Sequence, residues 1–144
     1  MAFTMTTAQK NAMLNTLSLS IGASGVTAAK LKIFDNTASP TGTPSNANST
    51  TGSNVLLGTL TFSVLPFGGT GLGGATGGVL TAGPITQDSA ADASGTALFY
   101  RIYNWNDVVL CQGSVGTSGA ELNLNSTNIV IGGPVSVTSL TISI

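Results

Sequence analysis

Apolar and polar residues alternate with a period of two along most of the chain, and this pattern predicts half-buried β-strands. Near residue 30, Leu31 and Ile33 alternate with Lys30, Lys32 and Phe34. The segment 56–64 repeats the pattern, with one parity holding Leu56, Leu60, Phe62 and Val64 and the other holding Leu57, Thr59, Thr61 and Ser63. We therefore expect two strands here, each with one face toward a core.

The segment 96–103 predicts a central strand, because both of its faces are mostly apolar. One face holds Ala97, Phe99, Arg101 and Tyr103, and the other holds Leu98, Tyr100 and Ile102. Turn-forming residues at 104–107 lead into an apolar segment at 108–113, which indicates a β-hairpin. Further short strands are expected near 79–86, 121–124, 128–131 and 135–144.

The last of these segments changes parity. Val135 and Val137 lie on one parity, whereas Leu140, Ile142 and Ile144 lie on the other. An extra residue in a strand restores the alternation by forming a β-bulge. We therefore expect a bulge near Thr138 or Ser139 that keeps both sets inward.

A short helix is predicted near the N-terminus, capped by Thr6 or Thr7. It would run through residues 8–15, end near residues 17–19 and be terminated by Gly22 and Gly25. One side of it would hold Met13, Leu14 and Leu17. A helix of about three turns is unstable alone, so it must dock on this subunit or on a neighbour.

Together these elements predict an all-β fold: a β-sandwich or jelly-roll-like single domain with a short N-terminal helix. Residues 1–25 form the helix or arm in this interpretation, and residues 26–144 form the sandwich domain. Two segments without periodicity, 36–54 and 68–78, are rich in Ser, Thr, Asn and Gly. They are either flexible surface loops or arms that contact other subunits.

Charged residues make up only 6% of the 144 residues, and the formal net charge is -1. An ordinary soluble domain has about 25% charged residues. A surface with so little charge has weak protection against association, so permanent contact with protein partners explains the composition best. The basic residues are Lys10, Lys30, Lys32 and Arg101. They are too few to neutralise a run of phosphates, and nucleic-acid binding is disfavoured.

The first ten residues lack the charged start and apolar stretch of a signal peptide. Apolar runs elsewhere are interrupted every few residues and never approach the ~20 residues of a membrane span. We expect a soluble chain with no membrane partner. Its one cysteine, Cys111, excludes an intramolecular disulfide and is expected to be a small core residue.

The chain contains no histidine, which removes the commonest general base and the commonest metal ligand. Serine triads and histidine zinc sites are thereby excluded, and a nucleophilic Cys111 would have no imidazole partner. A single cysteine also excludes a thiolate metal cluster. No catalytic residue, metal site or cofactor is expected.

Five carboxylates remain as candidate groups: Asp35, Asp88, Asp92, Asp107 and Glu121. A glycosidase-like pair needs two carboxyl groups about 5 to 9 Å apart, and no pattern brings two of these together. Asp88 and Asp92 could supply oxygens to a Ca²⁺ ion, but an EF-hand loop needs more acids and a final Glu. Turn formation is the simpler role for both.

Gly69, Gly71 and Gly74 match a dinucleotide-binding fingerprint, but the residues that follow are strand-like, so we interpret them as a glycine loop. Asn48 and Asn125 each begin an N-x-[ST] sequon, which we interpret as a chance match in a Ser/Thr-rich loop.

The aromatic residues Phe99, Tyr100, Tyr103 and Trp105 could form a stacking platform for bases or sugars. Only Arg101 adds positive charge beside them, so a sheet core with one aromatic edge is the favoured interpretation.

Several segments carry a resemblance to a family: AKLKIFDN, LLGTLTFS, ITQDSAADASGTALFYRIY and GSVGTSGAELNLNSTNIVIGGPVSVTSLTISI. The chain resembles small virion proteins of the head-decoration or capsid cement type from tailed phages. GSVGTSGAELNLNST and GGPVSVTS are the most specific parts. The resemblance implies an all-β subunit in a trimer or other symmetric cluster on the particle, and it brings no catalytic residues.

We therefore expect a non-enzymatic phage virion protein, assembled in the host cytoplasm, that binds the major capsid protein as a cement subunit and stabilises the head. A second possibility is a tail or fibre-associated virion protein that contacts host surface glycan through Tyr103, Trp105 or loop residues. A third is a glycan hydrolase, which requires a close pair of acids.

Overall fold

The computed structural model describes residues 1–22, 28–35, 43–68 and 74–144. The predicted domain boundary at residues 25 and 26, and Gly25 itself, lie outside these residues. The elements are, in chain order, α1 (Thr7–Ile21), β1 (Lys30–Asp35), β2 (Val55–Phe62), β3 (Val79–Thr81), β4 (Ile85–Thr86), β5 (Gly95–Thr96), β6 (Phe99–Tyr103), β7 (Val109–Gly116), β8 (Leu122–Leu124), β9 (Asn128–Ile129) and β10 (Val137–Ser143). The prediction of an all-β domain with a short N-terminal helix is confirmed.

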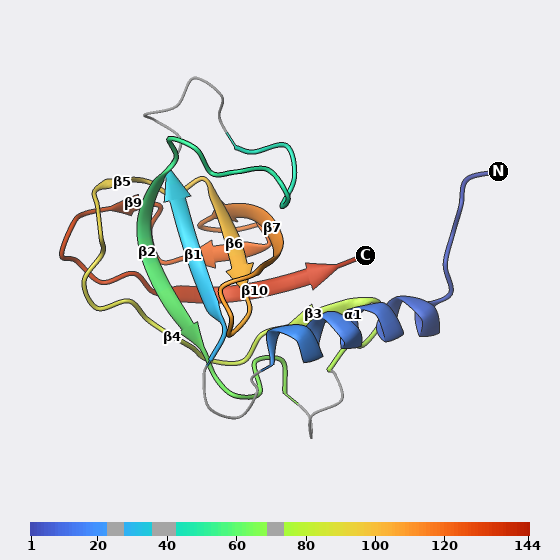
Figure 1. Cartoon of the computed structure of the whole chain (residues 1–144). Helices are drawn as coiled ribbons and strands as arrows, with labels where there is room; N and C mark the ends of the chain where they lie inside the picture. The colour runs from blue at the N-terminus through green and yellow to red at the C-terminus, as the bar shows by residue number, and fades with distance from the viewer. Residues whose placement is uncertain (23–27, 36–42, 69–73) are drawn as a thin grey trace.

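Eight strands form one curled sheet in the order β3-β10-β8-β7-β6-β1-β2-β4. Figure 1 shows β1, β2 and β6 side by side, with β10 crossing their direction. The neighbours pair antiparallel except β7 and β8, which run parallel. Strands β5 and β9 form a separate two-stranded sheet. The buried apolar side chains of both halves of the curled sheet meet in a single core.

Strand β6 is the central strand that the sequence predicts. Phe99, Tyr100, Arg101 and Ile102 are all buried, and β6 pairs with β1 on one side and β7 on the other. Its partner β7 follows after a short turn, which confirms the predicted hairpin. The ring of Phe99 stacks on that of Phe34 with 5.0 Å between centroids, on the face opposite the core.

In strand β2 the predicted alternation of buried and exposed residues is interrupted. Phe34 pairs with Leu56 but Ile33 pairs with Gly58, so Leu57 is an extra residue opposite β1. This bulge turns Leu57 fully into the core. Val64, which the alternation places inward, lies beyond the end of β2 and is 57% exposed.

The predicted bulge in the C-terminal strand is confirmed. Val137 pairs with Leu124 and Ser139 with Asn123, so Thr138 is the extra residue in β10. Leu140 is buried as a result. Ile144, which was expected to lie inward, follows the end of β10 and is 45% exposed, although its backbone N–H donates to the Gly78 carbonyl oxygen at 3.2 Å.

Helix α1 begins after Thr6, whose hydroxyl oxygen accepts a hydrogen bond from the Gln9 backbone N–H, and it ends before Gly22. It is thus slightly longer than predicted. The buried positions are Leu14, Ser18 and Ile21, which recur at helical spacing. Met13, predicted on this side, is 50% exposed, because neighbouring residues on a helix point about 100° apart.

Two asparagine side chains dock α1 on the sheet domain. The Asn15 side-chain oxygen accepts hydrogen bonds from the backbone N–H groups of Gly74 and Ala75, at 3.1 and 3.0 Å. The Asn11 oxygen accepts one from Gly78 at 2.8 Å. These polar contacts supplement the apolar face, so the helix packs on its own subunit.

Candidate interaction surface

Arg101 is buried in spite of its charge, and it holds a loop against the sheet. Its guanidinium Nη2 donates to the backbone carbonyl oxygens of Ser49 at 2.7 Å and Asn46 at 3.3 Å. Nε and Nη2 also donate to the side-chain oxygen of Gln112. The Gln112 amide in turn donates to the Pro44 carbonyl oxygen at 2.7 Å. We call residues 43–54 the strap, because these bonds fasten it over β6 and β7.

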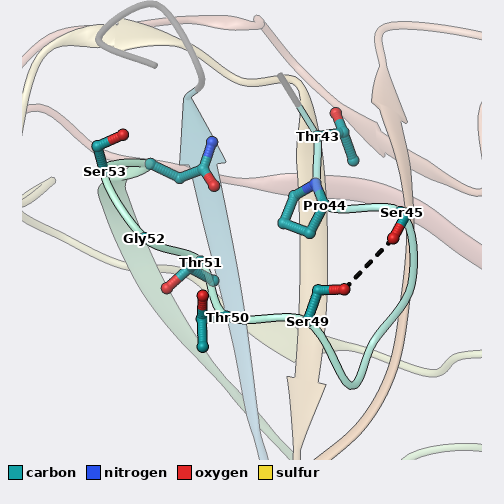
Figure 2. Close-up of a pocket in the computed structure, with 9 residues that line it drawn as sticks. Thr43, Pro44, Ser45, Ser49, Thr50, Thr51, Gly52 and Ser53 are labelled. Carbon is teal, nitrogen blue, oxygen red and sulfur yellow. Dashed lines mark hydrogen bonds between the residues drawn. The ribbon is translucent and has the colours of Figure 1, made fainter. Parts of the chain in front are cut away.

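The strap encloses a hollow of about 420 Å³ lined by its own residues. Figure 2 shows the hydroxyl side chains that surround it, with Ser45 and Ser49 joined across the loop by a hydrogen bond of 3.3 Å. Among the residues that the structure describes, the lining is rich in hydroxyl groups and holds no charged side chain. Polar ligands or water suit such a lining, whereas an ion lacks a counter-charge there.

A basic-aromatic patch lies on the same side of the sheet, where Lys30, Lys32 and Tyr103 are neighbours in β1 and β6. The Lys32 ammonium lies 4.3 Å from the centre of the Tyr103 ring, a cation–π contact. The Lys30 ammonium donates to both carboxylate oxygens of Asp107, at 3.0 and 3.2 Å. Lys32 lies 3.8 Å from the same carboxylate.

The position of Asp107 depends on the hairpin turn. The Asn104 side-chain oxygen accepts hydrogen bonds from the backbone N–H groups of Asn106 and Val108. Asp107 adopts a left-handed conformation with φ 57°, which Asp tolerates better than most residues. The hydrogen bond from Lys30, followed by the charges of Lys30 and Lys32, lowers the pKa of the Asp107 carboxyl. Trp105, at the same turn, is 46% exposed.

The predicted aromatic edge is therefore present. Phe99 and Tyr100 are buried, Tyr103 is partly exposed, and Trp105 is exposed at the tip of the hairpin. Nearby positive charge comes from Lys30 and Lys32, whereas Arg101, the cation that the sequence places beside these rings, is occupied by the strap. The strand pairing of β1 with β6 brings the lysines here, and no local pattern reveals it.

The candidate acids accept hydrogen bonds from the protein itself. The Asp35 carboxylate is buried and accepts from the Thr96 backbone N–H at 2.9 Å. The Asp88 carboxylate accepts from the N–H groups of Thr59 and Ala90. It thereby fastens the segment after β4 to the edge of β2.

The remaining two acids, Glu121 and Asp92, lie in different segments of the chain and have different hydrogen-bond partners. The Glu121 carboxylate accepts from the Ser114 backbone N–H at 3.1 Å. Asp92 is exposed, and its own N–H donates to the Leu57 carbonyl oxygen. Within the residues that the structure describes, no three His, Cys, Asp or Glu side chains gather into a group that could hold a metal ion.

Cys111 lies in β7 and packs partly buried against the core, close to its expected role. Burial, and then the charge of Glu121, raise the pKa of its thiol to about 12. Burial likewise raises the pKa of the Tyr100 phenol, followed by the charges of Cys111 and Glu121. Both groups therefore stay protonated near neutral pH.

Of the glycine fingerprint, Gly69 and Gly71 lie outside the described residues. Gly74 is described, and the element that follows the loop is strand β3. A nucleotide fingerprint requires a helix at this position, so the interpretation as a glycine loop is confirmed for this flank. The sequon residues Asn48 and Asn125 are both exposed.

Exposed apolar side chains are spread over the N-terminal residues, helix α1 and several loops. They are Met1, Phe3, Met13, Leu19, Val64, Leu65, Leu98, Trp105, Val108, Val130, Ile131 and Ile144. Single exposed apolar residues are common on soluble proteins. Adjacent exposed pairs at 64–65 and 130–131 make larger apolar patches, which are typical of protein contacts.

Comparison of the chain with protein-family models finds no match, and comparisons with curated proteins and with solved structures find none either. Among the described residues, no helix has the length and apolar character needed to cross a membrane.

Proposed function

We propose that this chain is a non-enzymatic virion subunit of a tailed phage: a capsid cement or decoration protein that binds the major capsid protein as a homo-oligomer, with a trimer favoured. The observation that carries the proposal is the exposure of large apolar side chains on a surface with very few charges. Phe3 is 87% exposed, and Val130 and Ile131 are 61% and 64% exposed. The family resemblance adds the virion as the setting.

The mechanism is interfacial. Each subunit would bridge neighbouring capsid proteins and bury apolar and hydroxyl-rich surface, worth about 25 cal/mol per Å² of apolar area before the costs of association. Symmetry repeats this contact over the whole particle, which multiplies its effect. With a net charge of -1, many copies can crowd together with little mutual repulsion.

The placement of the acids supports a structural role. Asp35, Asp88 and Glu121 each accept backbone hydrogen bonds that fasten one segment to another. A carboxylate used in this way stabilises the fold and is poorly placed to transfer protons to a substrate.

The test uses heads that lack this protein, with and without purified protein added back. Heads with the protein should survive higher temperature and stronger osmotic shock. Ile131→Ser should weaken rebinding, whereas Thr117→Ala, an exposed polar position, should not. Equal rupture of bare and decorated heads would refute the cement function.

A second candidate is a tail or fibre-associated virion protein that contacts host surface glycan. The exposed Trp105, two residues after Tyr103 in the chain, favours it, since an exposed aromatic ring suits a sugar face. Glycan-array binding that is lost in Trp105→Ala but kept in Val108→Ala would support it. The position of a labelled copy on the particle separates head from tail.

A further inference from the structure

We infer that helix α1 pairs with α1 of a second copy of this chain, antiparallel and about a two-fold axis that passes beside Thr16. The inference goes beyond the proposed function, because it concerns contacts between copies of this chain and needs no capsid protein. A two-fold contact joins copies in pairs. It is therefore additional to the three-fold contact of the favoured trimer, and it would link one trimer to another.

The outer face of α1 is the side opposite its docked face. Figure 1 shows α1 at the periphery of the molecule, beside β3. Leu14, Ser18 and Ile21 are buried on the docked side. At about 100° per residue, the side of the helix farthest from them is centred on Thr16. The exposed residues that make up this outer face are Ala12, Met13, Thr16, Leu19 and Ser20.

The outer face is uncharged and partly apolar, although it is exposed in the single chain. Met13 and Leu19 are 50% and 49% exposed. A surface helix usually carries charged and polar residues on its outer side, whereas a helix that is apolar on both sides is buried on both. Among the residues of α1, Lys10 alone is charged, and it lies partly buried beside Gly78 on the docked side. A second partner is therefore expected over the outer face.

The two hydroxyl groups of the outer face are hydrogen-bonded within the helix. The Thr16 hydroxyl donates to the Ala12 carbonyl oxygen at 3.1 Å. The Ser20 hydroxyl donates to the Thr16 carbonyl oxygen at 3.0 Å. Burial of a polar group is costly when the group loses its hydrogen bond. These hydroxyl groups keep theirs, so a partner can cover the outer face at little cost.

The order of large and small residues makes the outer face complementary to itself. Met13 and Leu19 lie three residues before and after Thr16, about 60° to either side of it around the helix. Antiparallel pairing centred on Thr16 brings residues before it in one copy level with residues after it in the other. Leu19 of each copy then lies over the small Ala12 of its partner. Met13 lies in the same way over the small Ser20. Helices pack by placing large side chains over such gaps, so a second copy fits this face.

The ends of α1 also favour an antiparallel helix as the partner. A helix has a partial positive charge at its N-terminus and a partial negative charge at its C-terminus. α1 has no acidic residue in its first turn and no basic residue in its last turn to offset these charges. An antiparallel copy places its C-terminus beside the N-terminus of the first copy and offsets both. Because the outer face is uncharged, the two copies meet without repulsion.

The size of the contact determines its strength. α1 has 15 residues, so it is about 22 Å long and about 10 Å wide, and its outer face covers roughly 220 Å² in projection. Interfaces of standard size bury roughly 800 Å² of accessible surface per partner. The helix pair is therefore a small, reversible contact. Where many copies lie close together on a particle, a contact of this kind gains strength from their high local concentration.

The test measures self-association of the full 144-residue chain by sedimentation velocity at low salt. Concentrations from about 1 μM to 1 mM cover the dissociation constants of weak contacts. Thr16→Glu and Thr16→Lys each bring two like charges together at the axis, and each should raise the dissociation constant at least about tenfold. Thr117→Glu places the same charge at an exposed threonine outside α1, and it should associate like the parent. Thermal unfolding checks that all variants fold.

A mixture of the two variants at Thr16 tests the two-fold arrangement. An equimolar mixture of Thr16→Glu and Thr16→Lys pairs opposite charges at the axis, so it should associate more tightly than either variant alone. This gain should shrink in 1 M NaCl, because salt screens exposed charges. A parent chain whose mass does not rise with concentration, unchanged association in Thr16→Glu, or a mixture no tighter than its components would each overturn the inference.

Binding to bare heads separates this inference from the proposed function. Thr16→Glu that loses self-association but still binds heads supports a contact between copies. Thr16→Glu that associates like the parent but no longer binds heads would overturn the inference, because the outer face would then bind the capsid protein, and the cement function would stand. A parent chain that associates through α1 but never binds heads would support the inference and refute the cement function.

Discussion

The guanidinium of Arg101 donates a hydrogen bond of 2.7 Å to the backbone carbonyl oxygen of Ser49, a residue 52 positions earlier in the chain. This bond joins the central strand β6 to the strap and leaves the cation buried. Hydrogen bonds from charged groups are stronger than neutral ones. The position of the strap therefore depends mainly on the Arg101 side chain.

Replacing Arg101 with Met should release the strap. We expect a loss of about 1.5–3 kcal/mol in the free energy of unfolding, the usual range for hydrogen bonds to a charged group. Amide hydrogen exchange within residues 43–54 should accelerate in the folded protein. Lys32→Met is the matched control, because Lys32 is the neighbouring cation and should contribute under about 1 kcal/mol. Unchanged exchange in the strap of Arg101→Met would contradict this role.

Gly113 in β7 has no room for a side chain. A Cβ atom there would meet the Glu121 carboxylate, and it would lie 2.7 Å from the Tyr100 ring. Gly113→Ala should destabilise the protein by about 1–3 kcal/mol, as overpacking usually does. Gly83→Ala is the control, since the nearest atom to its Cβ is 3.6 Å away. If urea unfolding gives the two variants the same free energy of unfolding, the side chains around residue 113 must move to accommodate the added Cβ atom.

The hairpin of β6 and β7 could be predicted from sequence because its signals are local. Apolar residues on both faces of 96–103 and four turn residues at 104–107 are read within one segment. The need for a bulge near Thr138 could be read in the same way, from a parity change within one strand. Local alternation thus predicts the fold class and most strands.

Features that depend on pairing between distant segments could not be predicted. The bulge at Leu57 follows from its register against β1, because the consecutive apolar residues Val55, Leu56 and Leu57 do not themselves show which of them is the extra residue. The strap over Arg101 joins residues 52 positions apart. The basic-aromatic patch likewise arises only when β1 pairs with β6.

Cys111 should react slowly in the folded protein. Burial, followed by the charge of Glu121, raises the pKa of its thiol from 9.0 to about 12, so little thiolate forms at pH 8. Since the thiolate is the reactive form, labelling with a disulfide reagent should be at least about 100-fold slower than in denaturant. A folded pKa above the unfolded one contributes stability below pH 9, and this contribution is lost as pH rises toward 12. Cys111→Ser should abolish labelling and remove this alkaline loss. Equal labelling rates in folded and unfolded protein would contradict the burial.

The ion pair between Lys30 and Asp107 should show a defined dependence on pH and salt. Because the folded pKa of Asp107 is lowered from 3.8, its contribution to stability is present above pH 3.8 and is lost as pH falls through the folded value. Asp107→Asn suits the test, since Asn also tolerates the left-handed backbone. A double-mutant cycle with Lys30→Met, measured by urea unfolding, should give a favourable coupling at pH 7 in low salt. The coupling should shrink in 1 M NaCl, since salt screens exposed charges, and vanish in strong acid. A coupling that is independent of both conditions would mean that contacts other than charge hold the turn against β1.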